Sequence, residues 1–126
     1  MYEDPEWVNE AKTAVKITYV EMVSFEEIVE SQSKVSAMLD SIDHRAFFIV
    51  DLRRLTAMSP QLISNFPAIA RLKLVSHPNL DRVINVVDNS FLESVASIFG
   101  RVYRKVYFVR TMEEALRQVS VENITR

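Results

Sequence analysis

The segment Ala46-Phe47-Phe48-Ile49-Val50-Asp51 is the strongest indication of the architecture of this chain. It is a continuous apolar run closed by an aspartate, and it follows a helical pattern, so it predicts a short strand buried on both faces. Such strands occupy parallel sheets that are covered by helices. Ligands of open α/β sheets bind beyond the carboxyl ends of the strands. We therefore expect the carboxyl end of the central strand from Phe47 to Asp51 to point towards any binding site.

Further strands flank this one in the sequence. Val83 to Val87 and Val106 to Val109 predict two more buried strands. Thr13 to Val20 alternates between apolar and polar residues, which predicts a half-buried strand. Together with a short first strand at Trp7 and Val8, it would form a hairpin and supply a mixed edge to the sheet.

Helices are predicted between these strands. The stretches Ser24–Glu27, Ser90–Glu93 and Thr111–Glu114 each have the pattern of a capping box, which opens a helix. Ser59-Pro60 fits the N-cap and first position of another helix, which Pro67 would kink or split. The expected order is β-β-α-β-α-β-α-β-α, a mostly parallel sheet with flanking helices in one domain over residues 1–126.

Composition excludes several classes of function. The 126 residues contain no cysteine and one glycine, Gly100, so cysteine chemistry and glycine-rich phosphate loops are absent. The net charge of -2 does not favour nucleic-acid binding. The basic residues Arg101, Arg104 and Lys105 suit the end of a helix. No apolar run is long enough to cross a membrane, and we expect no membrane insertion and a cytoplasmic location.

Polar residues gather where the predicted strands end. They are Asp51, Arg53, Arg54, Asp88, Asn89 and Arg110. The arginines could hold a phosphate or carboxylate group, although ordinary strand-end and capping roles would explain all six residues. His44 and His77 are predicted in turns without metal-ligand spacing, so we expect no metal and no cofactor. We find no catalytic constellation and predict that the protein is not an enzyme.

Four short sequence motifs resemble those of a known family. They are Phe47–Arg53, Arg82–Asp88, Val106–Val109 and Thr111–Ala115. The chain resembles the SpoIIAA-like branch of the STAS family and, more broadly, bacterial STAS/SEC14-type proteins. In the anti-sigma-factor antagonists of this fold, a partner kinase phosphorylates a serine that follows the central strand. The resemblance implies a non-enzymatic domain that acts by binding a partner.

The sequence departs from that family at the phosphorylated position. The matching stretch is Ser59-Pro60-Gln61-Leu62, in which Gln61 stands where the serine would be. Ser59 lies one or two positions away and is interpreted as a helix cap, so we predict that the phosphoserine switch is absent. Ser59 and Gln61 join the candidate binding residues.

Two functions remain open. The first is a protein-interaction module, forming a possible homodimer through the apolar helix from Ser90 to Tyr103. The second is a domain that binds or senses a small anionic or lipid-like ligand, at the strand ends or under the helix split by Pro67. A phosphorylated receiver domain with Asp51 as acceptor is a third interpretation, which the order of elements disfavours because no acidic pair precedes Asp51.

Overall fold

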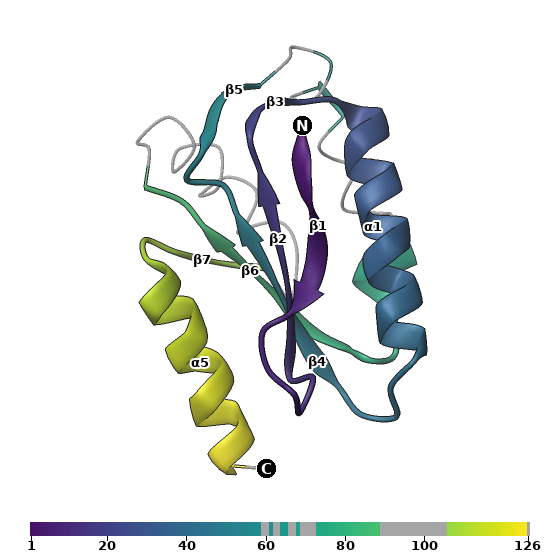
Figure 1. The fold of residues 1–126 in the computed structure, drawn as a ribbon, viewed down its shortest axis with the longest axis vertical. Helices are drawn as coiled ribbons and strands as arrows, with labels where there is room; N and C mark the ends of the chain where they lie inside the picture. Colours follow the sequence, from purple (N-terminus) through teal and green to yellow (C-terminus); the bar gives the residue numbers. More distant parts are fainter. Residues whose placement is uncertain (59–60, 62–63, 66–67, 69–72, 89–105, 126) are drawn as a thin grey trace.

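The computed structural model describes residues 1–58, 61, 64–65, 68, 73–88 and 106–125. Its main sheet has five strands, in the spatial order β1-β2-β4-β6-β7 (Figure 1). The strands are β1 (Tyr2–Trp7), β2 (Ala14–Tyr19), β4 (Ala46–Asp51), β6 (Leu80–Val86) and β7 (Val106–Val109). β1 pairs antiparallel with β2, and all other pairings in this sheet are parallel. The mostly parallel sheet with a hairpin at its edge is therefore confirmed.

β4 is the central strand, and all six of its residues are buried. Phe48 and Val50 belong to the core on one face of the sheet, while Phe47 and Ile49 belong to the core on the other. The first core includes residues of helix α1 (Phe25–Asp40), and the second includes residues of helix α5 (Met112–Thr125). Figure 1 shows the two helices on either side of the sheet. A strand covered on both faces explains the unbroken apolar run.

α1 begins as its capping box predicts. The Ser24 hydroxyl accepts from the Glu27 amide at 3.1 Å, and the Glu27 carboxylate accepts from the Ser24 amide at 3.1 Å. Farther along α1, the fully buried Ser31 donates to the Ile28 carbonyl and contacts the Tyr19 hydroxyl at 2.6 Å. Burial raises the pKa of Tyr19 to about 12. This buried pair joins α1 to β2 in the core.

α5 also begins near its predicted cap. The Glu114 amide donates to the Thr111 hydroxyl at 3.1 Å. The Glu114 carboxylate accepts from the Arg110 amide at 3.4 Å, one residue before the expected partner. Ala115 and Val119 are buried against the sheet, whereas Leu116 is 41% exposed.

Two short strands were not predicted. β3 (Glu21–Val23) and β5 (Leu55–Met58) pair in parallel and form a separate two-stranded sheet. Each follows closely on the carboxyl end of a main strand, β2 and β4 respectively. Segments of three and four residues are too short to show a period in the sequence. The expected order of elements lacks both strands and is therefore not confirmed in detail.

Two edge strands also differ from expectation. β1 extends from Tyr2 rather than Trp7 and contains Pro5, where the register shifts between Glu3 and Glu6. Proline is tolerated there because β1 is an edge strand. β7 has the predicted bounds but is not buried on both faces, since it lies at the end of the sheet order and Tyr107 is 45% exposed.

Several predictions fall outside the described residues. They concern Ser59, Asn89, most of the helix expected after Ser59, and the possible dimer helix from Ser90 to Tyr103. They stay predictions. Within the described part of the chain, no helix is long and apolar enough to cross a bilayer, and no three potential metal ligands cluster together.

Candidate functional site

Asp51 ends β4 and has both carboxylate oxygens engaged by one neighbour. Its Oδ1 accepts from the Arg53 amide at 3.1 Å and from Arg53 Nε at 2.9 Å. Its Oδ2 accepts from Arg53 Nη2 at 2.9 Å. The Asp51 side chain is 7% exposed and that of Arg53 is 38% exposed. The pair is thus a bidentate, charge-assisted contact at the border of the core.

The ionisation of Asp51 reflects two opposing effects. Burial favours the neutral acid, but the hydrogen bonds from the Arg53 side chain and amide outweigh burial and lower the pKa of Asp51. Asp51 in turn raises the pKa of Arg53, with a smaller contribution from the charge of Asp88. Asp51 is therefore an ionised carboxylate at neutral pH, stabilised from within the chain.

The second candidate arginine is also paired. Arg54 Nη1 lies 3.3 Å from Glu3 Oε2, and both side chains are exposed. An anion arriving at the strand ends would have to compete with Asp51 for Arg53 and with Glu3 for Arg54. This arrangement makes the two arginines poorer anion ligands than unpaired guanidinium groups would be.

Two other described candidates lie at the same edge of the sheet. Asp88 is exposed just after β6, and Arg110 is exposed just after β7. Asp88 is close enough to Arg53 to influence its ionisation. Gln61 lies elsewhere, facing a hollow beside the start of α1. The predicted residues therefore divide between the strand ends and this hollow.

The hollow has a volume of about 520 Å³. Its lining combines apolar and polar side chains from β3, the first turn of α1 and the segment after β5. They are Met22, Val23, Ser24, Phe25, Glu26, Glu27, Gln61 and Asn65. Among the candidates that the structure describes, Gln61 is the residue that borders it. Met22 and Val23 were missed because β3 was not predicted, and the residues at the start of α1 were interpreted only as a helix cap.

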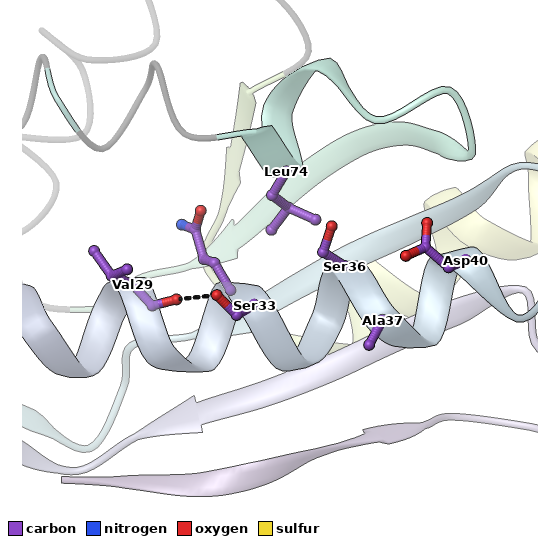
Figure 2. A pocket seen from close by; sticks show the side chains of 7 residues that line it. Val29, Ser33, Ser36, Ala37, Asp40 and Leu74 are labelled. Carbon is purple, nitrogen blue, oxygen red and sulfur yellow. Dashed lines mark hydrogen bonds between the residues drawn. The ribbon is translucent and has the colours of Figure 1, made fainter.

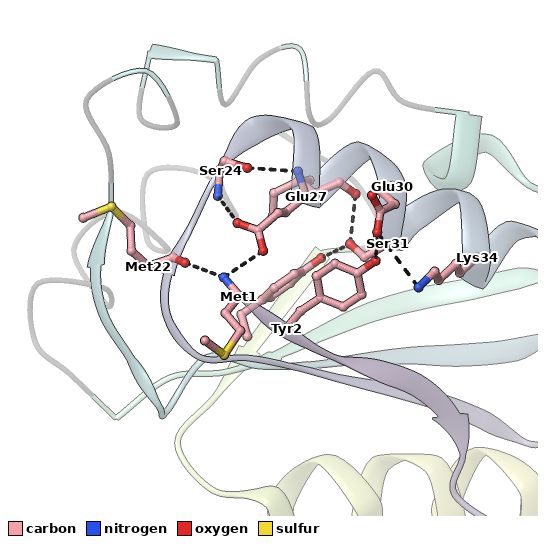
Figure 3. Close-up of polar contacts among 10 residues, drawn as sticks. Met1, Tyr2, Met22, Ser24, Glu27, Glu30, Ser31 and Lys34 are labelled. Carbon is pink, nitrogen blue, oxygen red and sulfur yellow. Dashed lines mark hydrogen bonds and ion pairs between the residues drawn. The ribbon is translucent and has the colours of Figure 1, made fainter.

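Hydrogen bonds hold β3 against the beginning of α1 (Figure 3). The ammonium group of Met1 donates to the Met22 carbonyl and forms an ion pair of 2.8 Å with Glu27 Oε2. This ammonium group, followed by the Ser24 amide, lowers the pKa of Glu27 against the effect of burial. Glu27 therefore caps the helix and anchors β1 beside β3, which gives the hollow a defined wall.

A second hollow, of about 420 Å³, runs along α1 opposite the 3-10 helix η1 (Lys73–Ser76). Figure 2 shows its small and polar lining, including Ser33, Ser36 and Ala37 on α1 and Leu74 across from them. None of the described candidate residues lines it.

His77, which was predicted in a turn, adjoins the end of this hollow and has a largely buried side chain. Its side chain is 9% exposed, and its Nδ1 accepts from the Asn79 amide at 3.0 Å. The proton therefore lies on Nε2, which donates to Asp40 at 2.7 Å. Asn79 Nδ2 donates to the carbonyls of Leu39 and Ile42 at 3.0 Å each. These contacts give His77 and Asn79 a structural role at the end of α1.

Comparison with known proteins shows likeness in structure but not in sequence. No protein-family model matches the chain, and no curated protein matches it. One similar solved structure is an uncharacterized protein of the DUF3478 family with a SpoIIAA-like fold from Shewanella loihica PV-4. It is 13% identical, with a TM-score of 0.60, and the match covers 84% of this chain and 83% of that one.

A second similar structure is the anti-sigma factor antagonist SpoIIAA in its unphosphorylated form. It is 18% identical, with a TM-score of 0.61, and the match covers 95% of this chain and 98% of that one. At these identities the likeness concerns the fold. Taken with the sheet order and the helices on both faces, it shows that this chain has a SpoIIAA-like fold.

Proposed function

We propose that the protein is a non-enzymatic, cytoplasmic protein-interaction module that binds its partner without a phosphoserine switch. The observation that carries the proposal is the position of Gln61. It stands where the family resemblance places the phosphorylated serine, and it borders an open hollow beside the exposed side chain of Met22. An amide at this position can donate and accept hydrogen bonds, but it cannot be phosphorylated as a serine can.

The state of Asp51 supports a binding role over phosphoryl transfer. Both of its oxygens accept hydrogen bonds from Arg53, so attack on a phosphoryl donor would first require this pair to separate. The structurally similar SpoIIAA is an anti-sigma factor antagonist, which is a regulatory role. A regulatory binding module is therefore the function that the fold and the site favour together.

Replacing Met22 with aspartate tests the proposal. Met22 is 54% exposed, so Met22→Asp should leave the fold intact while placing a charge in the contact surface. Leu116→Asp on α5 is the matched control, because Leu116 is also an exposed apolar residue, at 41%. Both variants and the wild type would be used for quantitative affinity capture from the native cell extract.

The expected result is at least one protein that the wild type and Leu116→Asp retain in stoichiometric amounts and Met22→Asp loses. Circular dichroism checks that both variants are folded. The proposal is wrong if Met22→Asp and the wild type retain the same proteins.

A small ligand is the second candidate, because a hollow of about 520 Å³ lies within the usual range of ligand sites. Most of its lining is polar, with two glutamates, which disfavours the anionic ligand considered from the sequence. Native mass spectrometry of protein purified from its own cells distinguishes the two candidates. A stoichiometric small molecule that Met22→Asp loses would favour this second function.

A further inference from the structure

The negative charges around the hollow are not all balanced. Glu27 pairs with the Met1 ammonium group, Glu30 with Lys34, and Glu3 with Arg54. Glu26 lines the hollow and Glu21 begins β3, and both are exposed. Within the described part of the chain neither forms an ion pair. The uncompensated carboxylate of Glu26 therefore lies at the hollow, and that of Glu21 belongs to the β3 residue next to the lining residue Met22.

Apolar side chains lie between these carboxylates in the chain. Met22 follows Glu21 and is 54% exposed, and the half-buried Phe25 precedes Glu26. Methionine is flexible and polarizable, and it suits surfaces that adapt to the side chains of a partner. Figure 3 shows the Met22 side chain extending from β3, away from the polar contacts around Met1.

Amide groups complete the surface. Gln61 and Asn65 also line the hollow. Asn65 donates two hydrogen bonds to the Gln61 carbonyl, one of 3.0 Å from its backbone amide and one of 2.8 Å from Nδ2. These two bonds fix Asn65 relative to Gln61. The combination of unpaired carboxylates, exposed methionine and amides constitutes what we call the acidic-apolar surface: Glu21, Met22, Phe25, Glu26, Gln61 and Asn65.

We infer that the acidic-apolar surface binds a protein segment that carries a lysine or arginine next to a large apolar side chain. The cation would compensate Glu21 and Glu26, and the apolar side chain would cover Met22 and Phe25. The inference rests on the proposed function and adds the chemistry of the partner. Both interactions are needed, because exposed ion pairs alone contribute little and an apolar contact alone gives little selectivity.

Selection from a random twelve-residue peptide library tests this chemistry. The folded wild-type chain is the bait, and Met22→Lys, whose added positive charge repels a cationic peptide, is used for counter-selection. We expect the selected peptides to contain a lysine or arginine within four residues of a leucine, methionine or phenylalanine. Their affinity, measured by fluorescence polarisation, should fall roughly tenfold in Glu21→Gln/Glu26→Gln and should weaken as salt is raised.

The matched control is Glu10→Gln/Asp43→Asn, which removes two exposed carboxylates away from the hollow. It should bind the selected peptides like the wild type. Gln61→Lys, which adds a positive charge at the rim, should weaken binding further than Gln61→Ala. Selection of acidic or uncharged sequences, enrichment of no sequence, or equal losses in the two double variants would each overturn the inference.

Failure of this inference can be told from failure of the proposed function. If capture from extract finds a Met22-dependent protein while the selected peptides carry no cation, the interaction module stands and the partner chemistry is wrong. If capture finds no Met22-dependent protein, the proposed function itself is contradicted.

Discussion

Replacing Arg53 with methionine should destabilise the protein much more than the same change at Arg54. Arg53→Met removes two charge-assisted hydrogen bonds, both of 2.9 Å, from a carboxylate whose side chain is 7% exposed. Loss of a partner from a buried charged group costs about 1.5–3 kcal/mol per hydrogen bond. The partial exposure of Arg53 reduces this cost through solvent screening, so we expect a loss of about 2–3 kcal/mol in the free energy of unfolding at pH 7.

The neighbouring Arg54 provides the control. Its ion pair with Glu3 is exposed on both sides, and Arg54→Met should cost less than about 0.5 kcal/mol. Urea unfolding can be followed by the fluorescence of Trp7, the single tryptophan of the chain. A loss for Arg53→Met that does not exceed the loss for Arg54→Met would refute the argument.

The loss should also depend on pH. Arg53 lowers the pKa of Asp51 in the folded protein, so the pair contributes stability above the unfolded pKa of about 4 and loses it as pH falls through the folded pKa. In Arg53→Met, burial acts with less opposition and raises the pKa of Asp51. The difference in stability between wild type and variant should therefore shrink between about pH 6 and pH 3. An unchanged difference across this range would contradict the assignment to Asp51.

Three further outcomes are expected. Ser31→Ala should lower the free energy of unfolding by about 1–3 kcal/mol, because it leaves the Tyr19 hydroxyl buried without its partner. Tyr19→Phe should lower it by about 1 kcal/mol. The reverse ranking of the two variants in urea unfolding would disprove this. Asn79→Asp removes the two hydrogen bonds that Asn79 donates to carbonyls at the end of α1. It should lower the free energy of unfolding by about 2–3 kcal/mol, which is more than the loss expected for Asn79→Ala. Equal stability of Asn79→Asp and the wild type would exclude this role. Incubation with acetyl phosphate and magnesium should add no phosphoryl mass in intact mass spectrometry; a phosphoryl group that Asp51→Asn abolishes would instead establish the receiver interpretation.

The candidate site shows where sequence patterns stop being informative. The position of Asp51 at the end of a buried strand follows from the apolar run before it. The sequence does not predict that Arg53 donates to both carboxylate oxygens of Asp51, because an arginine exposed to solvent would have the same sequence pattern. Apart from Gln61, the lining of the hollow was not predicted, because its walls come from β3, from the start of α1 and from the segment after β5, and the lining residues lie between positions 22 and 65 of the chain.

Elements with local signals could be predicted from the sequence. The unbroken run before Asp51 predicted a strand covered on both faces, and the Ser24 and Thr111 caps located two helices, because caps and periods of burial depend on residues a few positions apart. The tertiary structure decided which strand lies at an edge, which charges are paired and where β3 meets β5. These depend on contacts between distant segments, and a strand of three residues gains its hydrogen bonds from a partner far along the chain.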